Sequence, residues 1–279
     1  MDERCLSNIH VQQFSRYLHR EEKSDATYEK YIRDVRRFAC FASGRQVSKE
    51  LVLEWKRYLI EQSYAVRSIN SMLASVNSFL KCMGWQDCVV KNVRIQQQTY
   101  CSEDKELTRE EYLRLLNAAD GNKRLKLVLQ AICATGIRVS ELRHFTVDAV
   151  CRGEIVVDCK GKTRTILIPG KLKKLLMHYA KQHNIVAGAV FLGRNGKPMD
   201  RSSIWRQMKH LCKVANVKSS KVFPHNLRKL FARTFYSIEK DIAKLADILG
   251  HSSINTTRIY LVTTGSEHRR KLERLRLVI

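Results

Sequence analysis

The stretch Ala134-Thr135-Gly136-Ile137-Arg138-Val139-Ser140-Glu141-Leu142 interrupts a helical pattern near the middle of the chain. A helix is predicted from about Lys123 to Thr135, and Gly136 ends it, as glycine commonly does at a helix C-terminus. Arg138 follows at once, in front of a new helix start. Taken alone, this stretch is also what an ordinary helix-turn-helix junction with a solvated arginine would show.

Three further signals follow in order toward the C-terminus. They are the basic turn Lys160-Gly161-Lys162, the helix start Pro224-His225-Asn226-Leu227-Arg228, and Leu249-Gly250-His251 followed by Thr256-Thr257-Arg258-Ile259-Tyr260. The His-x-x-Arg spacing places both side chains on one helix face, at an end whose backbone N–H groups favour an anion. Each signal has an ordinary alternative: a solvated hairpin tip, a histidine cap, a packed aromatic.

Two strand patterns flank the basic turn, Glu154–Asp158 and Arg164–Ile168. A capping box over Thr108–Glu111 opens the first helix of this half of the chain. Helical patterns return around residues 172–183, 203–214, 226–236 and 242–249. These patterns predict a mainly α domain with a small antiparallel sheet, an α+β fold.

The first third of the chain is helical by pattern, starting with a stretch around residues 11–18. Apolar residues then recur at helical spacing in three runs: Tyr31, Ile32, Val35, Phe38 and Ala42; Leu51, Trp55, Tyr58 and Leu59; Ile69, Met72, Leu73, Val76, Phe79, Leu80 and Met83. We expect a bundle of four helices with these stripes as its core. Residues 95–106 lack an apolar period and are predicted to be a linker between a domain over 1–94 and a second over 107–279.

The charge balance is strongly basic, with 51 Lys and Arg against 27 Asp and Glu, a net charge of +24. Such a surplus repels itself and favours a polyanionic partner, nucleic acid above all. A basic protein without a nucleic-acid role, or one that binds an anionic membrane surface, would share the composition. In a nucleic-acid-binding protein the contacts would come from the polar faces of the first helices, which carry Lys30, Arg33, Arg36, Arg37, Lys56, Arg57 and Arg67.

The membrane interpretation is weakened by the sequence itself. The charged start Met1-Asp2-Glu3-Arg4 is not typical of a signal peptide, and the most apolar stretch, Leu125–Ile137, is too short to span a bilayer. We therefore expect a cytoplasmic protein. Its 9 cysteines form no C-x-x-C pair and no Cys/His group with zinc-site spacing, so we expect reduced thiols.

In order, Arg…Lys…His-x-x-Arg…Gly-His…Tyr resembles the active-site signature of the tyrosine recombinases, the lambda-integrase and Xer-like family. The nine positions between His251 and Tyr260 are similar to the spacing in that family. The resemblance covers nearly the whole chain. It implies a SAM-like helical core-binding domain (1–94), a linker (95–106) and a catalytic domain with a C-terminal tail helix (107–279).

The resemblance implies that Tyr260 is the nucleophile and forms a 3′-phosphotyrosyl bond with DNA. Arg138 and Arg228 would grip the non-bridging oxygens of the scissile phosphate, which suits the planar and permanently charged guanidinium. Their charge would stabilise the pentacovalent transition state.

The other roles carried over are those of the bases and the acid. His225 is the candidate base, His251 would hydrogen-bond the phosphate, and Lys160 would protonate the departing 5′ oxygen. The hairpin is one residue shorter than the commonest form in the family, so Lys162 is the alternative acid. Glu141 would act either by supporting the neighbouring arginine or directly in the chemistry.

The chemistry implied by the resemblance needs no cofactor. The phosphodiester energy stays in the tyrosyl bond, and neither an ATP-binding G-x-x-x-x-G-K-[ST] loop nor a metal-binding carboxylate cluster is present in the sequence. Expected partners are double-stranded DNA and further copies of the chain in a tetramer. The tail over Glu267–Ile279 would dock on a neighbouring subunit, or else close its own domain as a helix.

Within recombinases the sequence favours an integrase of a mobile element, with a Xer-like chromosome resolvase and a DNA inversion switch as alternatives. Two other classes remain open. One is a catalytically silent DNA-binding protein of the same fold, and the other is a relaxing topoisomerase.

Overall fold

The computed structural model describes residues 4–94, 103–159, 162–262 and 265–275, in two compact units. The first spans Met1–Gln97 and the second Gln98–Ile279, so the division falls inside the stretch expected to be a linker. Most of that predicted linker, residues 95–102, lies outside the described residues. Among the helices that the structure describes, none combines the length and apolar character needed to cross a membrane.

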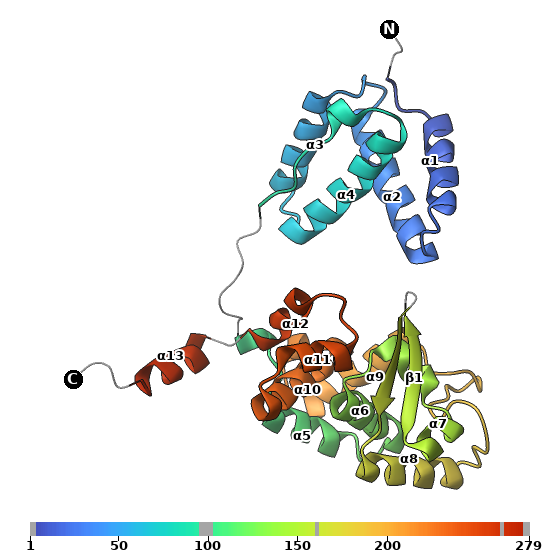
Figure 1. Cartoon of the computed structure of the whole chain (residues 1–279), viewed down its shortest axis with the longest axis vertical. Helices are drawn as coiled ribbons and strands as arrows, with labels where there is room; N and C mark the ends of the chain where they lie inside the picture. Colours follow the sequence, from blue (N-terminus) through green and yellow to red (C-terminus); the bar gives the residue numbers. More distant parts are fainter. Residues whose placement is uncertain (1–3, 95–102, 160–161, 263–264, 276–279) are drawn as a thin grey trace. The chain divides into compact units, whose positions relative to one another are not determined.

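The N-terminal unit is a helical bundle (Figure 1). Its elements are α1 (Asn8–Arg20), α2 (Asp25–Ala42), α3 (Lys49–Glu61), α4 (Val66–Cys82) and the short 3-10 helix η1 (Gln86–Cys88). The four expected helices are therefore present.

Aromatic side chains fill the centre of this bundle. Phe38 and Trp55 meet edge to face at 5.1 Å between ring centroids, and Phe14 meets Phe79 at 5.5 Å in the same way. All four are fully buried, and the helical stripes predict this for Phe38, Trp55 and Phe79. Tyr58 was expected in the core, but it is 42% exposed and lies against Phe41 at the edge of the stripe.

The C-terminal unit is mainly helical with one small sheet, which confirms the expected fold class. Its elements are η2 (Glu103–Lys105), α5 (Arg109–Ala118), α6 (Lys123–Thr135), η3 (Val139–His144), α7 (Val147–Arg152), β1 (Glu154–Cys159), β2 (Lys162–Leu167), α8 (Gly170–Gln182), α9 (Arg201–Val214), η4 (Ser219–Lys221), α10 (Pro224–Glu239), α11 (Ile242–Leu249), α12 (Ile254–Leu261) and α13 (Gly265–Glu273). The capping box at α5 is formed, with Thr108 Oγ1 accepting from the Glu111 N–H at 3.2 Å and the Glu111 carboxylate accepting from the Thr108 N–H at 2.9 Å.

The sheet pairs β1 with β2 as an antiparallel hairpin. Ile155 lies opposite Ile166, and Val157 lies opposite Arg164. Because side chains alternate between the two faces of a strand, the buried Ile155, Val157 and Ile166 place Arg164 on the core side of the sheet. A charged side chain thus points inward.

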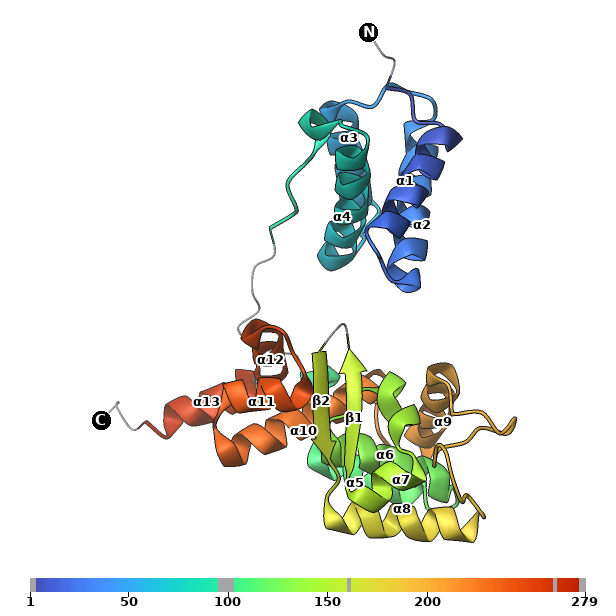
Figure 2. The same ribbon diagram turned by 45° about the vertical axis from the view of Figure 1, so that its right-hand side comes forward.

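Two helix packings position the remaining elements. α10 packs on α6, the central helix of the main core, and α11 and α12 pack on α10, as Figures 1 and 2 both show. The contacts of α11 and α12 with α10 form a separate small core of Ala232, Leu245, Leu249 and Tyr260, with Phe231 packed beside it. Tyr260 is therefore held by packing on α10 and α11.

Candidate active site

Gly136 ends α6 in the left-handed conformation, with φ +63°. A Cβ added there would lie 2.4 Å from Cδ1 of Phe231 on α10, so the Phe231 ring would have to shift. The chain then turns into η3 rather than a full helix, with Arg138 as its N-cap. This turn brings the carbonyl of Gly136 and the side chain of Arg138 to the face where α10 begins and α11 ends.

Arg138 is held by a carboxylate on one side and a carbonyl on the other. Its backbone N–H and its Nη1 donate to Glu141 at 2.8 and 2.9 Å, and its Nη2 donates to the carbonyl of Gly250 at 2.9 Å. The Arg138 side chain is still 32% exposed, whereas that of Glu141 is 7% exposed. One edge of the guanidinium therefore stays open to an anion.

Arg228 lies one helical turn after His225 on α10 and is 3% exposed. It donates to the carbonyl of Gly136 and, at 2.5 Å, to that of Leu249, and its Nη2 lies 3.3 Å from Nε2 of His251. Burial, and then the charge of Arg138, lower its pKa to about 10. No carboxylate within the described ranges pairs with Arg228, and its Nε is buried without a partner there. A buried cation with only neutral partners favours an anionic ligand.

Two imidazoles flank the phenol ring of Tyr260. The centroid of that ring lies 5.0 Å from the His225 ring and 5.1 Å from the His251 ring, and Tyr260 itself is 6% exposed. Burial, followed by the charges of Arg228 and Lys229, lowers the pKa of His225. The imidazole of His225 is therefore neutral near pH 7 and can accept a proton.

His251 follows the end of α11 and is fixed through both ring nitrogens. Its Nδ1 lies 2.8 Å from Oγ1 of Thr257, which is fully buried on α12. Burial, then the positive charge of Arg228 and Arg138, lowers the pKa of His251 to about 4. Without DNA, Nε2 faces the Arg228 guanidinium and accepts from it, so Nδ1–H donates to Thr257.

Five of the six residues expected at the site thus lie together: Arg138, His225, Arg228, His251 and Tyr260. Lys160 is outside the described residues. Lys162 begins β2, opposite Cys159 in the hairpin register, and the choice between these two lysines stays a prediction.

Two side chains of the site were not expected, Arg164 and Thr257. Arg164 on β2 donates to Glu141 at 2.6 Å and to the carbonyl of Leu249. A signal for it was present, because Arg164 shares strand parity with Ile166 and Ile168, both apolar and both buried. The cluster holds three guanidinium groups and the single carboxylate of Glu141 among its described members, so it is strongly positive.

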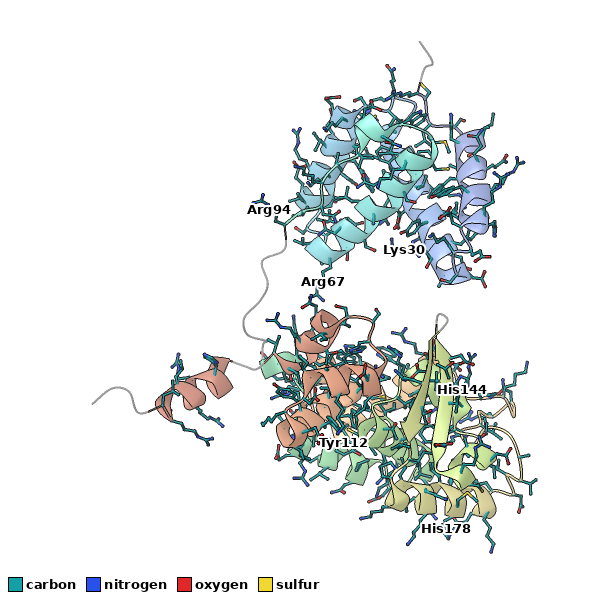
Figure 3. The ribbon with its side chains drawn as sticks, viewed as in Figure 1. Lys30, Arg67, Arg94, Tyr112, His144 and His178 are labelled. Carbon is teal, nitrogen blue, oxygen red and sulfur yellow. The ribbon has the colours of Figure 1, made fainter. Side chains whose placement is uncertain are left out.

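The basic residues expected to face DNA in the N-terminal unit divide into two kinds. Lys30, labelled in Figure 3, is not available to contact DNA. Its Nζ donates to Asp34 at 2.7 Å and to the Ser71 carbonyl and Ser75 hydroxyl at 2.8 Å. Asp34 is 4% exposed, and the positive charge of Lys30 compensates its buried carboxylate. Five of the other six are exposed: Arg33, Arg36, Arg37, Arg57 and Arg67.

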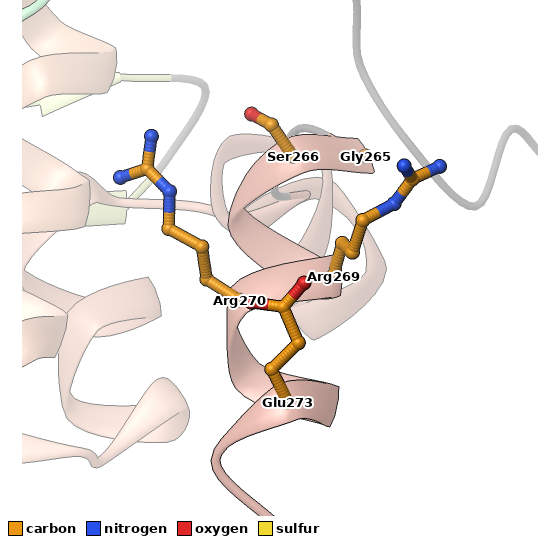
Figure 4. Close-up of a pocket in the computed structure, with 5 residues that line it drawn as sticks. All are labelled: Gly265, Ser266, Arg269, Arg270 and Glu273. Atoms are coloured by element: carbon orange, nitrogen blue, oxygen red, sulfur yellow. The ribbon is translucent and has the colours of Figure 1, made fainter.

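A shallow pocket runs along α13, away from this chemistry (Figure 4). It is lined by Gly265, Ser266, Arg269, Arg270 and Glu273, all from that one helix. None of the residues expected to be catalytic belongs to it. No group of three or more metal-ligating side chains occurs in the part of the chain that the structure describes.

Two family models match the chain. The model of the phage integrase family matches residues 105–266, more than half of the chain, and the N-terminal SAM-like domain of phage integrases matches residues 11–87. The tyrosine recombinase XerA of Pyrococcus furiosus is 27% identical over 288 residues, covering 100% of this chain and 98% of the relative. The tyrosine recombinase XerD of Staphylococcus aureus is 28% identical over 286 residues, covering 93% and 96%.

Solved structures share the fold. The Tn1549 transposon integrase in complex with transposon right end DNA matches with a TM-score of 0.70 at 17% identity, over 95% of this chain and 99% of that one. A lambda integrase tetramer bound to a Holliday junction matches with a TM-score of 0.72 at 16% identity, over 90% and 76%. Together with the matched family models, these observations show that the chain belongs to the phage integrase family of tyrosine recombinases, enzymes that cleave and rejoin DNA.

Proposed function

We propose that this chain is a site-specific recombinase that cuts and rejoins DNA strands through a 3′-phosphotyrosyl bond to Tyr260. The observation that carries the proposal is the position of this phenol, between the rings of His225 and His251 and beside the buried guanidinium of Arg228. A phenol is protonated at neutral pH, and attack on phosphorus needs a base together with positive charge at the phosphate.

In the proposed cleavage, the Tyr260 oxygen forms a bond to phosphorus and the bond from phosphorus to the 5′ oxygen breaks. His225, neutral because its pKa is lowered, accepts the phenol proton. Lys160 supplies a proton to the departing 5′ oxygen, with Lys162 as the alternative. Rejoining runs these steps in reverse from the 5′ hydroxyl of the incoming strand.

Arg138 and Arg228 bind the non-bridging oxygens in this proposal. Both lie where the Gly136 turn meets the end of α11, and the buried Arg228 has no carboxylate partner in the described part of the chain. A bound phosphate would supply the missing negative charge. As charge builds up in the transition state, preorganised donors in a water-poor site stabilise it more than solvent would. His251 adds a hydrogen bond to the same phosphate as the tautomer that is protonated at Nε2, in which Nδ1 accepts from the hydroxyl of Thr257.

The test begins with the target. Sequencing the DNA junctions formed in cells that carry the gene identifies the site, and a nicked duplex of that sequence then traps the intermediate. We expect the wild type to give a covalent protein–DNA adduct and Tyr260→Phe to give none. Tyr236→Phe, in the same small core, is the matched control and should still form the adduct. An adduct that persists in Tyr260→Phe would remove the proposed nucleophile.

We further propose double-stranded DNA and a synaptic tetramer as partners, with the C-terminal tail docking in trans and the protein acting in the cytoplasm. The fold shared with the lambda integrase tetramer on a Holliday junction supports this assembly. The proposed role is integration and excision of a mobile element, which the similarity in fold to the Tn1549 integrase supports. A chromosome resolvase is the alternative role, because two relatives are named XerA and XerD. The sequenced junctions distinguish the two roles.

A further inference from the structure

Arg164 is a buried charge for which the proposed chemistry has no use. It stands on the core side of β2 opposite Val157, and its side chain is 10% exposed. Removing a guanidinium from water is costly unless its hydrogen bonds and its charge are matched. A hydrophobic residue would fill this position of the strand more cheaply, so the contacts of Arg164 point to its role.

These contacts join the parts of the proposed phosphate site. Nη2 of Arg164 donates at 2.6 Å to Oε2 of Glu141, the same oxygen that accepts from the Arg138 N–H at 2.8 Å. Nη1 of Arg164 donates to the carbonyl of Leu249, which also accepts from Nη2 of Arg228 at 2.5 Å. Two acceptors, Glu141 and the Leu249 carbonyl, thus connect all three arginines.

Gly250, the residue after Leu249, shows how closely the side chain of Arg164 approaches the end of α11. Gly250 has φ +63°, and a Cβ built on it would lie 2.4 Å from Nη1 of Arg164. The carbonyl of Gly250 in turn accepts from Arg138. The chain therefore passes between Arg164 and Arg138 at a point where only a glycine leaves room.

Charge sharing follows from this arrangement. A carboxylate paired with Arg138 alone would cancel much of the positive charge meant for the phosphate. Because Glu141 is shared by two guanidinium groups, the trio of Arg138, Glu141 and Arg164 keeps a net charge of about +1. Glu141 can then orient Arg138 without neutralising it.

We infer that Arg164 is a positioning residue of the recombinase: through Glu141 and the Leu249 carbonyl it fixes Arg138 and Arg228 on the scissile phosphate. This inference rests on the proposed function. In the alternative role, Arg164 would only anchor the β1–β2 hairpin. Its loss would then affect the leaving 5′ oxygen and not the non-bridging oxygens of the phosphate.

The first experiment measures single-turnover cleavage of the nicked duplex and affinity for the intact duplex. We expect Arg164→Met to cleave about 10²-fold more slowly, the scale expected when a catalytic group is misplaced by about 1 Å, while duplex affinity stays within about threefold. Arg164→Lys, which keeps the charge but cannot bridge two acceptors in a fixed fork, should cleave at an intermediate rate. Thr165→Ala, the exposed neighbour on the other face of β2, is the control and should match the wild type.

Coupling to Glu141 provides the second experiment. If Arg164 acts through this carboxylate, the double variant of Arg164→Met and Glu141→Gln should cleave about as fast as the slower single variant. Losses that multiply would overturn the inference, and so would an Arg164→Lys variant as fast as the wild type.

The third experiment uses a duplex with sulfur in place of the bridging 5′ oxygen, whose thiolate leaves without a proton. Lys160→Ala should regain most of its cleavage on this substrate if that lysine is the acid, whereas Arg164→Met should stay slow. Recovery of Arg164→Met would overturn the inference in favour of the hairpin role. A wild type without any adduct would refute the proposed function, whereas an adduct made equally fast by Arg164→Met refutes only this inference.

Discussion

The imidazole of His251 is kept neutral by its surroundings, and this has a consequence for stability. Burial and the neighbouring arginines lower its pKa to about 4 from the ordinary 6.5. Between these two pH values the unfolded chain binds a proton at this position that the folded chain does not. Stability is therefore lost as the pH falls from 6.5 toward 4 and is fully present above 6.5.

Replacing His251 by Gln should flatten this acid loss of stability. The measurement is the urea midpoint of unfolding at a series of pH values between 4 and 7. Part of the dependence will remain, because the pKa of His225 is lowered in the same direction. His178→Gln, at an exposed position of α8, is the control and should leave the profile of the wild type. A His251→Gln profile as steep as that of the wild type would contradict the burial argument.

Much of the site follows from local sequence, and what does not is long-range. His-x-x-Arg predicted that His225 and Arg228 share a face of α10, because helical spacing is a local property. Lys30 was expected at a DNA-facing surface but holds the buried Asp34 and Ser75, and Ser75 lies 45 positions further along the chain. Local pattern cannot show which distant acceptor a cation will find.

At the scale of elements, the end of α11 decides where three side chains meet. Gly250 closes this helix in the left-handed conformation, and the chain turns at once to His251. The strand and helix patterns predicted α11 and β2 separately. Their contact through Arg164 could not be predicted, since the pairing of a strand with a distant helix end depends on the whole packing.

Gly250→Ala should damage this junction in two ways. A residue with a Cβ in the left-handed region costs about 1 kcal/mol or more, and its Cβ would lie 2.4 Å from Nη1 of Arg164. We expect both a lower free energy of unfolding and cleavage slowed by at least about tenfold, as Arg164 is displaced. Gly196→Ala has a similar φ of +70° with nothing within 4 Å, so it should lose stability alone. Unchanged cleavage by Gly250→Ala would show that the contact is not needed.

For the whole molecule, the surplus of +24 makes DNA binding depend strongly on salt. Each phosphate neutralised contributes about 0.9 to the slope of log affinity against log salt concentration. Arg67, exposed on α4, should contribute one such contact, so Arg67→Ala should reduce the slope by about 0.9 and weaken all sequences alike. The measurement is duplex affinity across salt concentrations. A slope equal to that of the wild type would remove Arg67 from the interface.

The separate small core around Tyr260 gives the C-terminal unit two levels of stability. Ala232, Leu245, Leu249 and Tyr260 bury far less apolar surface together than the main core around α6. Subglobal opening of α11 and α12 should therefore occur well below the free energy of complete unfolding. Amide hydrogens of α12 will exchange with solvent sooner than those of α6. On gentle heating the proposed nucleophile, Tyr260, will be released, and strand cutting will cease, while most of the protein is still folded.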